Sequence, residues 1–352
     1  MEEKQVRNGR EVYLDVLKAW AIIGVVLIHI SVERMQSDLS GLSAYTFIYA
    51  CSRFSVPIFF MVTGIFLTKP TSDVSLRKLY GNRILRILFA AFVYGVIYKL
   101  LRLHIAGERM GLIDFIKSYI CDFARANLEF HFWYVYALIA IYISAPILKE
   151  FLNNTKRKTI EYFIIIWIIC NALYLCGKEG FIVTPYNMFD GYNFLGMFVS
   201  YTGFVVLGYY LYHFGLPLKL LRMIDGCGTI IVLLAIYATI YDMEHSGVAR
   251  IEYLSYYSPA IIFLSISVFE HAKRNRFNQE SLVTRFMLHL GSHTMPVYFI
   301  HFVMIIICFQ WNMPQLTIYP VVDIAIYLLI VLIPSWLYAA LIGRIPVIKR
   351  LL

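Results

Sequence analysis

Apolar stretches long enough to cross a lipid bilayer recur along the whole chain, and this feature constrains the fold more than any other. The bilayer core holds no water, so backbone polar groups within it must be satisfied inside helices. The 352 residues are 60% hydrophobic and 15% charged, whereas a soluble domain of this size carries about a quarter charged residues. We therefore predict an all-α, polytopic transmembrane bundle that forms a single domain over residues 1–352. The ten expected spans lie roughly at 13–32, 45–67, 84–104, 132–149, 160–176, 195–212, 228–241, 255–271, 289–310 and 318–342.

The formal net charge of +9 is spread unevenly along the chain. With the N-terminus inside, most Lys and Arg residues fall in the termini, in the loops on the same side and in the span ends beside them. Cytoplasmic loops of membrane proteins carry such an excess of positive charge. We therefore expect both termini to be cytoplasmic, and the basic residues indicate membrane topology rather than nucleic-acid binding. The basic tracts are Lys4–Arg10, Lys69–Arg86, Lys149–Lys158, Lys219–Arg222, Lys273–Arg285 and Arg344–Arg350.

Two ionisable side chains share one face of the first expected span. Lys18 lies near its inner end, and His29 follows eleven residues later in the outer half of the membrane. Eleven residues of α-helix cover roughly 16 Å and return to nearly the same face. An ionisable group within a span costs roughly 2.5 to 3.5 kcal/mol, so it indicates a functional site unless a partner satisfies it. His29 is a candidate general base, whereas Lys18 either serves a ligand, reaches the inner interface or pairs with Asp15.

Four further polar residues are expected inside the membrane or at its outer surface. Arg53 lies inside the second span and Asp323 lies near the outer end of the last one. These two residues either pair with each other or serve a site. His301 lies within the ninth span, and His131 opens the fourth span at the outer interface, within reach of an acceptor molecule.

On the inner side, Arg83 and Arg86 begin the third span three residues apart, which places both guanidinium groups on one helix face. This spacing suits the binding of phosphate. The excess of positive charge at any cytoplasmic loop explains it as well. The six cysteines show no metal-ligand spacing, so we expect no metal.

Taken together, these motifs resemble the acyltransferase 3 family of membrane acyltransferases, which includes enzymes that O-acylate surface polysaccharides. The opening from Arg10 through Asp15 and Lys18 to His29 resembles the first helix of the family, in which Arg or Lys precedes His by eleven positions. Thr63 stands where the family usually has Ser. The other similar segments, in chain order, are Ser55–Gly64, Arg83-x-x-Arg86, His131-Phe-Trp133-Tyr134-Val, Gly203–Leu211, Ser292–His301 and Arg344-Ile-Pro346.

The resemblance implies a ten-helix bundle in the bacterial cytoplasmic (inner) membrane, surrounded by membrane lipids. It would transfer an acyl group from cytoplasmic acetyl-CoA, or another acyl-CoA, to a hydroxyl of an extracytoplasmic glycan or cell-envelope acceptor. The acyl-CoA would be a co-substrate. The family's catalytic first-helix histidine maps to His29. The expected donor-binding residues are Lys18, Arg83 and Arg86.

From these residues we form one hypothesis for the mechanism. The CoA phosphates bind the inner basic residues, and the pantetheine arm extends through an apolar channel towards His29. His29 then either deprotonates the acceptor hydroxyl or accepts the acyl group transiently. Arg53 stabilises the developing oxyanion. A carboxylate orients His29 or the acceptor, and the candidates are Glu129, Asp190 and Asp323. The expected acceptor-binding residues are Glu129, His131, Trp133, Tyr134 and His301.

Intramembrane His, Arg and Asp residues also mark transport pathways and proton relays. The alternative interpretation is therefore a transporter or permease of a small polar metabolite or glycan. Movement of substrate without acyl-CoA would indicate this alternative.

Overall fold

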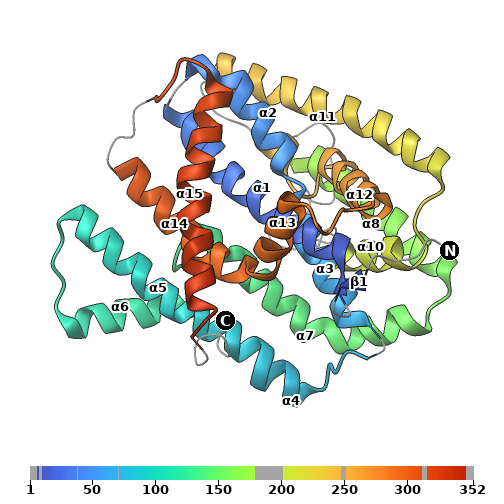
Figure 1. Cartoon of the computed structure of the whole chain (residues 1–352), viewed down its shortest axis with the longest axis horizontal. Helices are drawn as coiled ribbons and strands as arrows, with labels where there is room; N and C mark the ends of the chain where they lie inside the picture. The colour runs from blue at the N-terminus through green and yellow to red at the C-terminus, as the bar shows by residue number, and fades with distance from the viewer. Residues whose placement is uncertain are drawn as a thin grey trace.

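The computed structural model describes residues 6–7, 10–37, 39–69, 71–178, 201–246, 251–310 and 315–345. In this part of the chain almost all regular structure is helical (Figure 1). The only strands in it are β1 (Val6–Arg7) and β2 (Arg10–Glu11), which pair antiparallel just before the first helix. Eight helical segments there are long and apolar enough to cross a membrane, or nine if one sharply bent pair counts as a span. The prediction of an all-α polytopic membrane protein is confirmed.

Most predicted spans correspond to one helix or to two consecutive helices, and further elements connect them. The helices of the predicted spans are α1 (Val12–Ser37), α2 (Leu42–Ser52), α3 (Ser55–Thr68), α5 (Leu85–Ala106), α7 (Trp133–Asn154), α8 (Arg157–Lys178), α10 (Thr202–His213), α11 (Leu218–Ser246), α12 (Pro259–Arg274), α14 (Thr294–Gln310) and α15 (Pro320–Ile342). The further elements are η1 (Leu39–Gly41), α4 (Leu76–Lys78), η2 (Leu79–Ile84), α6 (Leu112–Ala124), η3 (Phe130–Phe132), η5 (Ile251–Leu254) and α13 (Leu282–Ser292). The sixth predicted span, 195–212, begins outside the described residues, and α10 is its described part.

Helix α1 runs through the centre of the bundle, between α2, α3, α13 and α15 (Figure 1). In its most apolar window 67% of the residues are buried, against 28% in α11 and 22% in α8, so α1 is a core helix and the other two lie at the periphery. The central position explains how α1 can carry ionisable side chains. Lys18 and His29 are both partly buried within protein rather than directed at lipid.

Two predicted spans are interrupted rather than continuous. The span expected at 45–67 turns at Arg53 and Phe54, where α2 ends and α3 begins. The span expected at 289–310 divides at His293 into α13 and α14, which are bent by 87°. At the first break Arg53 and Phe54 keep right-handed helical dihedral angles, and Leu42–Thr68 as a whole is long and apolar enough to form one span, as predicted. At the second break the sharp bend adds α13 to the predicted span, and a bend at membrane depth is tolerated where protein buries the backbone.

A glycine contact brings α10 close to α3. A Cβ atom on Gly208 would lie 2.6 Å from the backbone of Met61, which is too close for any side chain other than hydrogen. Small residues allow the backbones of membrane helices to approach each other in this way. The contact holds α3 in position, and α3 supplies several of the cavity residues described below.

Residues at or beside three of the basic tracts meet at one end of the bundle. Glu11 lies 4.0 Å from Lys69 and accepts a hydrogen bond from Tyr212. Lys273 donates a hydrogen bond to the backbone oxygen of Tyr212 (3.1 Å). Glu11, Lys69 and Lys273 therefore lie at the same end of the bundle. The positive-inside rule predicts that this end faces the cytoplasm.

Candidate functional site

A cavity of about 360 Å³, which we call the basic cavity, lies between α1, α3, α5, α7 and the start of α14. This volume falls within the usual range for small-molecule and cofactor pockets. Apolar and aromatic side chains form much of its wall, among them Phe66, Leu138 and Met295. The cavity thus combines an apolar interior with the charged groups described next.

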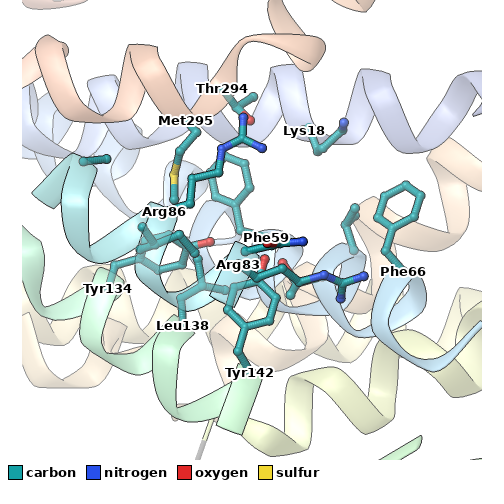
Figure 2. A pocket seen from close by; sticks show the side chains of 15 residues that line it. Lys18, Phe59, Phe66, Arg83, Arg86, Tyr134, Leu138, Tyr142, Thr294 and Met295 are labelled. Atoms are coloured by element: carbon teal, nitrogen blue, oxygen red, sulfur yellow. The ribbon is translucent and has the colours of Figure 1, made fainter. Parts of the chain in front are cut away.

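All three residues predicted to bind the donor line the basic cavity. Lys18 reaches it from α1, Arg83 from η2 and Arg86 from the first turn of α5 (Figure 2). The Lys18 Nζ atom also lies 2.7 Å from Asp15 Oδ1, so the expected pair with Asp15 and the position in the cavity occur together. Three cationic groups around one cavity attract a polyanionic ligand, and two of them can bind phosphate through paired hydrogen bonds.

The two arginines reach this cavity through an unusual local geometry. Arg83 lies in η2, a six-residue π-helix, and Arg86 lies just beyond it in regular α-helix. π-Helical turns are rare in proteins, and those that occur are often found at functional sites. The shared cavity agrees with the three-residue spacing, but the π-helix that produces it has no signature in the sequence.

A second and much smaller cavity of about 30 Å³, which we call the histidine cavity, lies farther along α1 at His29. Val25 and Ile28 from α1 and Val56 from α3 form its aliphatic wall. Val25 and His29 lie on the same helix face as Lys18 because their separations are close to whole numbers of turns. The other lining residues are Phe59, His131, Trp133, Tyr134, Tyr256 and Tyr298.

Phe59 and Tyr134 line both cavities. Their ring centroids are 6.0 Å apart, and the two side chains come from α3 and α7. Figure 2 shows Phe59 and Tyr134 in the same hollow as Lys18 and Arg86. The direct route from the basic residues to His29 therefore passes these two rings.

Three histidines from distant parts of the chain meet at the histidine cavity. The ring centroids of His29 and His301 are 5.3 Å apart, and those of His131 lie 6.1 and 5.6 Å from them. His301 Nδ1 donates to the backbone oxygen of Tyr298 (2.5 Å), which leaves Nε2 as the acceptor of a neutral ring. Within the described residues, this Nε2 atom and both ring nitrogens of His131 are buried without a hydrogen-bond partner. Leaving a buried polar atom without a partner is costly, so three such atoms in one histidine cluster indicate a ligand site.

Arg53 stands behind this cavity rather than in it. Its Nε atom donates to the backbone oxygen of Leu254 (2.8 Å), and its guanidinium carbon lies 3.5 Å from the ring centroid of Tyr256. Tyr256 lines the histidine cavity, whereas Arg53 does not. The observed contact of Arg53 is therefore with the wall, and direct stabilisation of an oxyanion stays a prediction.

A family model described as an acyltransferase domain (Acyl_transf_3) matches residues 11–340, which is nearly the whole chain. The chain belongs to the acyltransferase 3 family. The resemblance drawn from its motifs is confirmed, and the protein is a membrane acyltransferase. No curated protein and no solved structure matches it. The matched range includes both cavities and all three histidines.

In this acyltransferase Asp323 is not beside His29. Its carboxylate accepts hydrogen bonds from the Arg34 side chain (Nε, 2.8 Å) and from the backbone nitrogen of Leu316 (2.8 Å). The expected pair between Arg53 and Asp323 is therefore wrong, because Arg34 at the end of α1 takes the carboxylate instead. The buried ion pair joins α1 to α15, and a catalytic role for Asp323 stays a prediction.

The predicted acceptor-binding residues divide into two groups. His131, Trp133 and Tyr134 line the histidine cavity, and His301 contacts its histidines. Glu129 instead forms an ion pair with Arg102 (2.8 Å). Its neighbour Phe130 packs on His29, so the Glu129 pair lies near the cavity without lining it. The third carboxylate considered from the sequence, at position 190, is outside the described residues.

Several lining residues were not predicted as site residues. Val56 and Phe59 lie in the Ser55–Gly64 segment that resembles the family and Val25 lies in the first span, but only the fold shows that these apolar residues face a cavity. Tyr298 and Tyr256 are aromatic residues in a chain with 27 tyrosines, so their type alone indicates nothing. The position of Tyr298 three residues before His301, on the same helix face, was the one usable clue.

Proposed function

We propose that this acyltransferase moves an acyl group from cytoplasmic acyl-CoA to a hydroxyl group of an extracytoplasmic glycan or cell-envelope acceptor, in the cytoplasmic membrane of a bacterium. One observation carries the proposal: the basic cavity and the histidine cavity share Phe59 and Tyr134. A donor with a polyanionic end and a long neutral arm fits such an arrangement. Its charged end and its reactive end would occupy different cavities.

The donor would bind with its phosphates at Lys18, Arg83 and Arg86. Charge-assisted hydrogen bonds make guanidinium groups strong phosphate ligands. The pantetheine arm would then extend past Phe59 and Tyr134. The separation of Lys18 from His29, roughly 16 Å along α1, is of the order of that arm.

The transfer step requires a base beside the thioester carbonyl. His29 would take the proton of the acceptor hydroxyl, whose oxygen attacks the carbonyl carbon. A carbon–oxygen ester bond forms and the carbon–sulfur bond breaks. The proton on His29 then passes to the CoA thiolate as it leaves. The unpartnered Nε2 atom of His301 and one ring nitrogen of His131 would accept hydrogen bonds from acceptor hydroxyls, and the other His131 nitrogen would donate one. Trp133 would form part of the wall beside them.

The donor side is tested by equilibrium binding of acetyl-CoA to the purified protein in detergent. The Arg83→Ala/Arg86→Ala double variant is compared with Arg77→Ala/Lys78→Ala, which removes the same charge from exposed positions outside the basic cavity. We expect saturable binding that the first variant loses and the second keeps. No binding at millimolar acetyl-CoA by folded wild-type protein would contradict the proposal.

The direction of transfer is tested in inside-out membrane vesicles that contain the protein, with labelled acetyl-CoA outside. We expect label to be incorporated covalently into the envelope material inside the vesicles, and His29→Ala to abolish it. Uptake of an unmodified glycan or metabolite without acyl-CoA would instead support a transporter, since buried His and Arg residues also serve transport.

A further inference from the structure

The histidine cavity is far smaller than the basic cavity that adjoins it, about 30 Å³ against about 360 Å³. A void of roughly 10 to 15 Å³ is needed to hold one water molecule, so the histidine cavity has room for about two or three heavy atoms. The carbonyl oxygen and methyl group of an acetyl thioester need about this much space. Each further methylene group has to displace a side chain of the wall.

The aliphatic side of this wall is stiff. Val25, Ile28 and Val56 are all buried, with 4%, 5% and 6% of their surface exposed. β-Branched side chains in a helix hold one strongly preferred rotamer, so they do not swing aside as Leu or Met does. Val25 and Ile28 also flank His29 on α1, the core helix. A longer chain would therefore meet fixed atoms next to the reacting group.

On the aromatic side of the wall, Tyr256 is packed against Arg53, which lies outside the cavity. The Arg53 guanidinium lies 3.5 Å from the centroid of the Tyr256 ring, and the same side chain is anchored to the backbone oxygen of Leu254. A cation over an aromatic face is attracted to the ring, so the ring resists rotation away from it. Arg53 thus positions Tyr256 without lining the cavity.

We infer that the histidine cavity limits the length of the acyl chain. On the proposed function, the cavity admits an acetyl group and excludes longer acyl groups. Val25 and Val56 set the limit, and Arg53 maintains it as a positioning residue through Tyr256. The inference deepens the proposed function, because it assigns the transferred group and the residues that select it.

The test measures the binding of acetyl-, propionyl- and butyryl-CoA to the purified full-length protein, with intact thioesters verified by mass spectrometry. For wild type we expect butyryl-CoA to bind about tenfold more weakly than acetyl-CoA, since inserting methylene groups into a packed site is unfavourable. Val25→Ala and Val56→Ala should bring this ratio close to one. Two separate variants keep the test usable if one of them fails to fold.

The matched control is Val26→Ala, which removes the same atoms from a fully buried neighbour that lines neither cavity. It should keep the wild-type ratio. Arg53→Met should also lower the ratio, whereas general destabilisation would weaken the binding of all three acyl-CoAs alike and leave the ratio unchanged. Equal binding of all three acyl-CoAs by wild type, or an unchanged ratio in both cavity variants, would overturn the inference and leave the proposed function standing. Absence of binding by any acyl-CoA would instead refute the proposed function itself.

Discussion

Tyr298 donates its hydroxyl hydrogen to the backbone oxygen of His131 across 2.6 Å, and this bond joins two segments that are 167 residues apart in the chain. The backbone oxygen of Tyr298 in turn accepts a hydrogen bond from His301 Nδ1. One residue on α14 therefore fixes both the position of η3 and the orientation of the His301 ring. Through these two contacts Tyr298 organises two of the three histidines around the cavity at His29.

We predict that Tyr298→Phe lowers both stability and activity. The change removes one of two donors from the buried His131 oxygen, which keeps the backbone N–H of Trp133, so we expect a loss of about 0.5 to 1.5 kcal/mol. The freed η3 segment would also misplace His131, and we expect kcat to fall roughly tenfold or more because small displacements at a reaction centre are costly. Thermal unfolding in detergent and transfer of labelled acetyl groups in inside-out vesicles measure the two effects. The control Tyr94→Phe loses a hydrogen bond to Tyr338 away from both cavities and should lower stability alone.

A second prediction concerns His29 itself. Removing a general base costs typically 10² to 10⁴ in rate, so His29→Ala should lower kcat by about that factor without weakening acetyl-CoA binding. His245→Ala, which changes an exposed histidine at the end of α11, should leave both quantities unchanged. Full acyl transfer by a correctly inserted His29→Ala protein would remove His29 from the mechanism.

The role of the unpartnered His301 Nε2 atom can be separated from that of Nδ1. An Asn side chain can donate from a position close to that of Nδ1, so His301→Asn keeps the bond to Tyr298 and removes only the Nε2 acceptor. We predict near-normal thermal stability and a loss of about 10² in kcat, together with a raised KM for the acceptor. Normal kinetics in this variant would show that Nε2 takes no part in binding or catalysis.

The comparison of sequence and structure shows which kinds of feature a sequence can specify. Lys18 and His29 lie on one continuous helix, so helical periodicity was enough to place both on one face. Lys18 lines the basic cavity and His29 lines the histidine cavity. The three-residue spacing of Arg83 and Arg86 likewise predicted that they share a helix face, and both line the basic cavity, although the π-helical turn at Arg83 was not predicted. Shared faces of this kind depend on regular helical geometry, which the spacing of residues specifies.

Features that depend on distant segments were predicted less well. Asp323 pairs with Arg34, 289 residues away, and Arg34 lies beyond the predicted first span at 13–32, where nothing in the sequence marks it as a partner. Tyr134 was predicted as an acceptor-binding residue, but its position beside Phe59 in the wall of both cavities depends on the packing of α3 against α7. Aromatic residues are common in membrane spans, so the type of Phe59 alone does not distinguish a cavity wall from a lipid contact.

The close contact of α10 with α3 leads to a prediction about two glycines. Gly208→Ala would drive a methyl group into the Met61 backbone, which cannot move without shifting α3, so we expect a loss of about 1 to 3 kcal/mol. Gly226→Ala serves as the matched control on α11, because nothing lies within 4 Å of the added Cβ atom. That variant should gain about 0.5 to 1 kcal/mol from its higher helix propensity. Thermal unfolding of both proteins in the same detergent decides the comparison.

The buried pair of Arg34 and Asp323 predicts a non-additive response to mutation. Asp323→Leu leaves the Arg34 guanidinium charged and buried, so we expect it to destabilise the protein by about 3 to 5 kcal/mol. Adding Arg34→Met removes that unpaired buried charge. The double variant should recover most of the lost free energy of unfolding, because apolar side chains can replace a buried ion pair at little cost. The double variant should also recover acyl transfer per folded molecule, since Asp323 contacts Arg34 and Leu316 rather than His29. Restored folding with abolished transfer would mean instead that Asp323 acts in catalysis, as the sequence had first suggested.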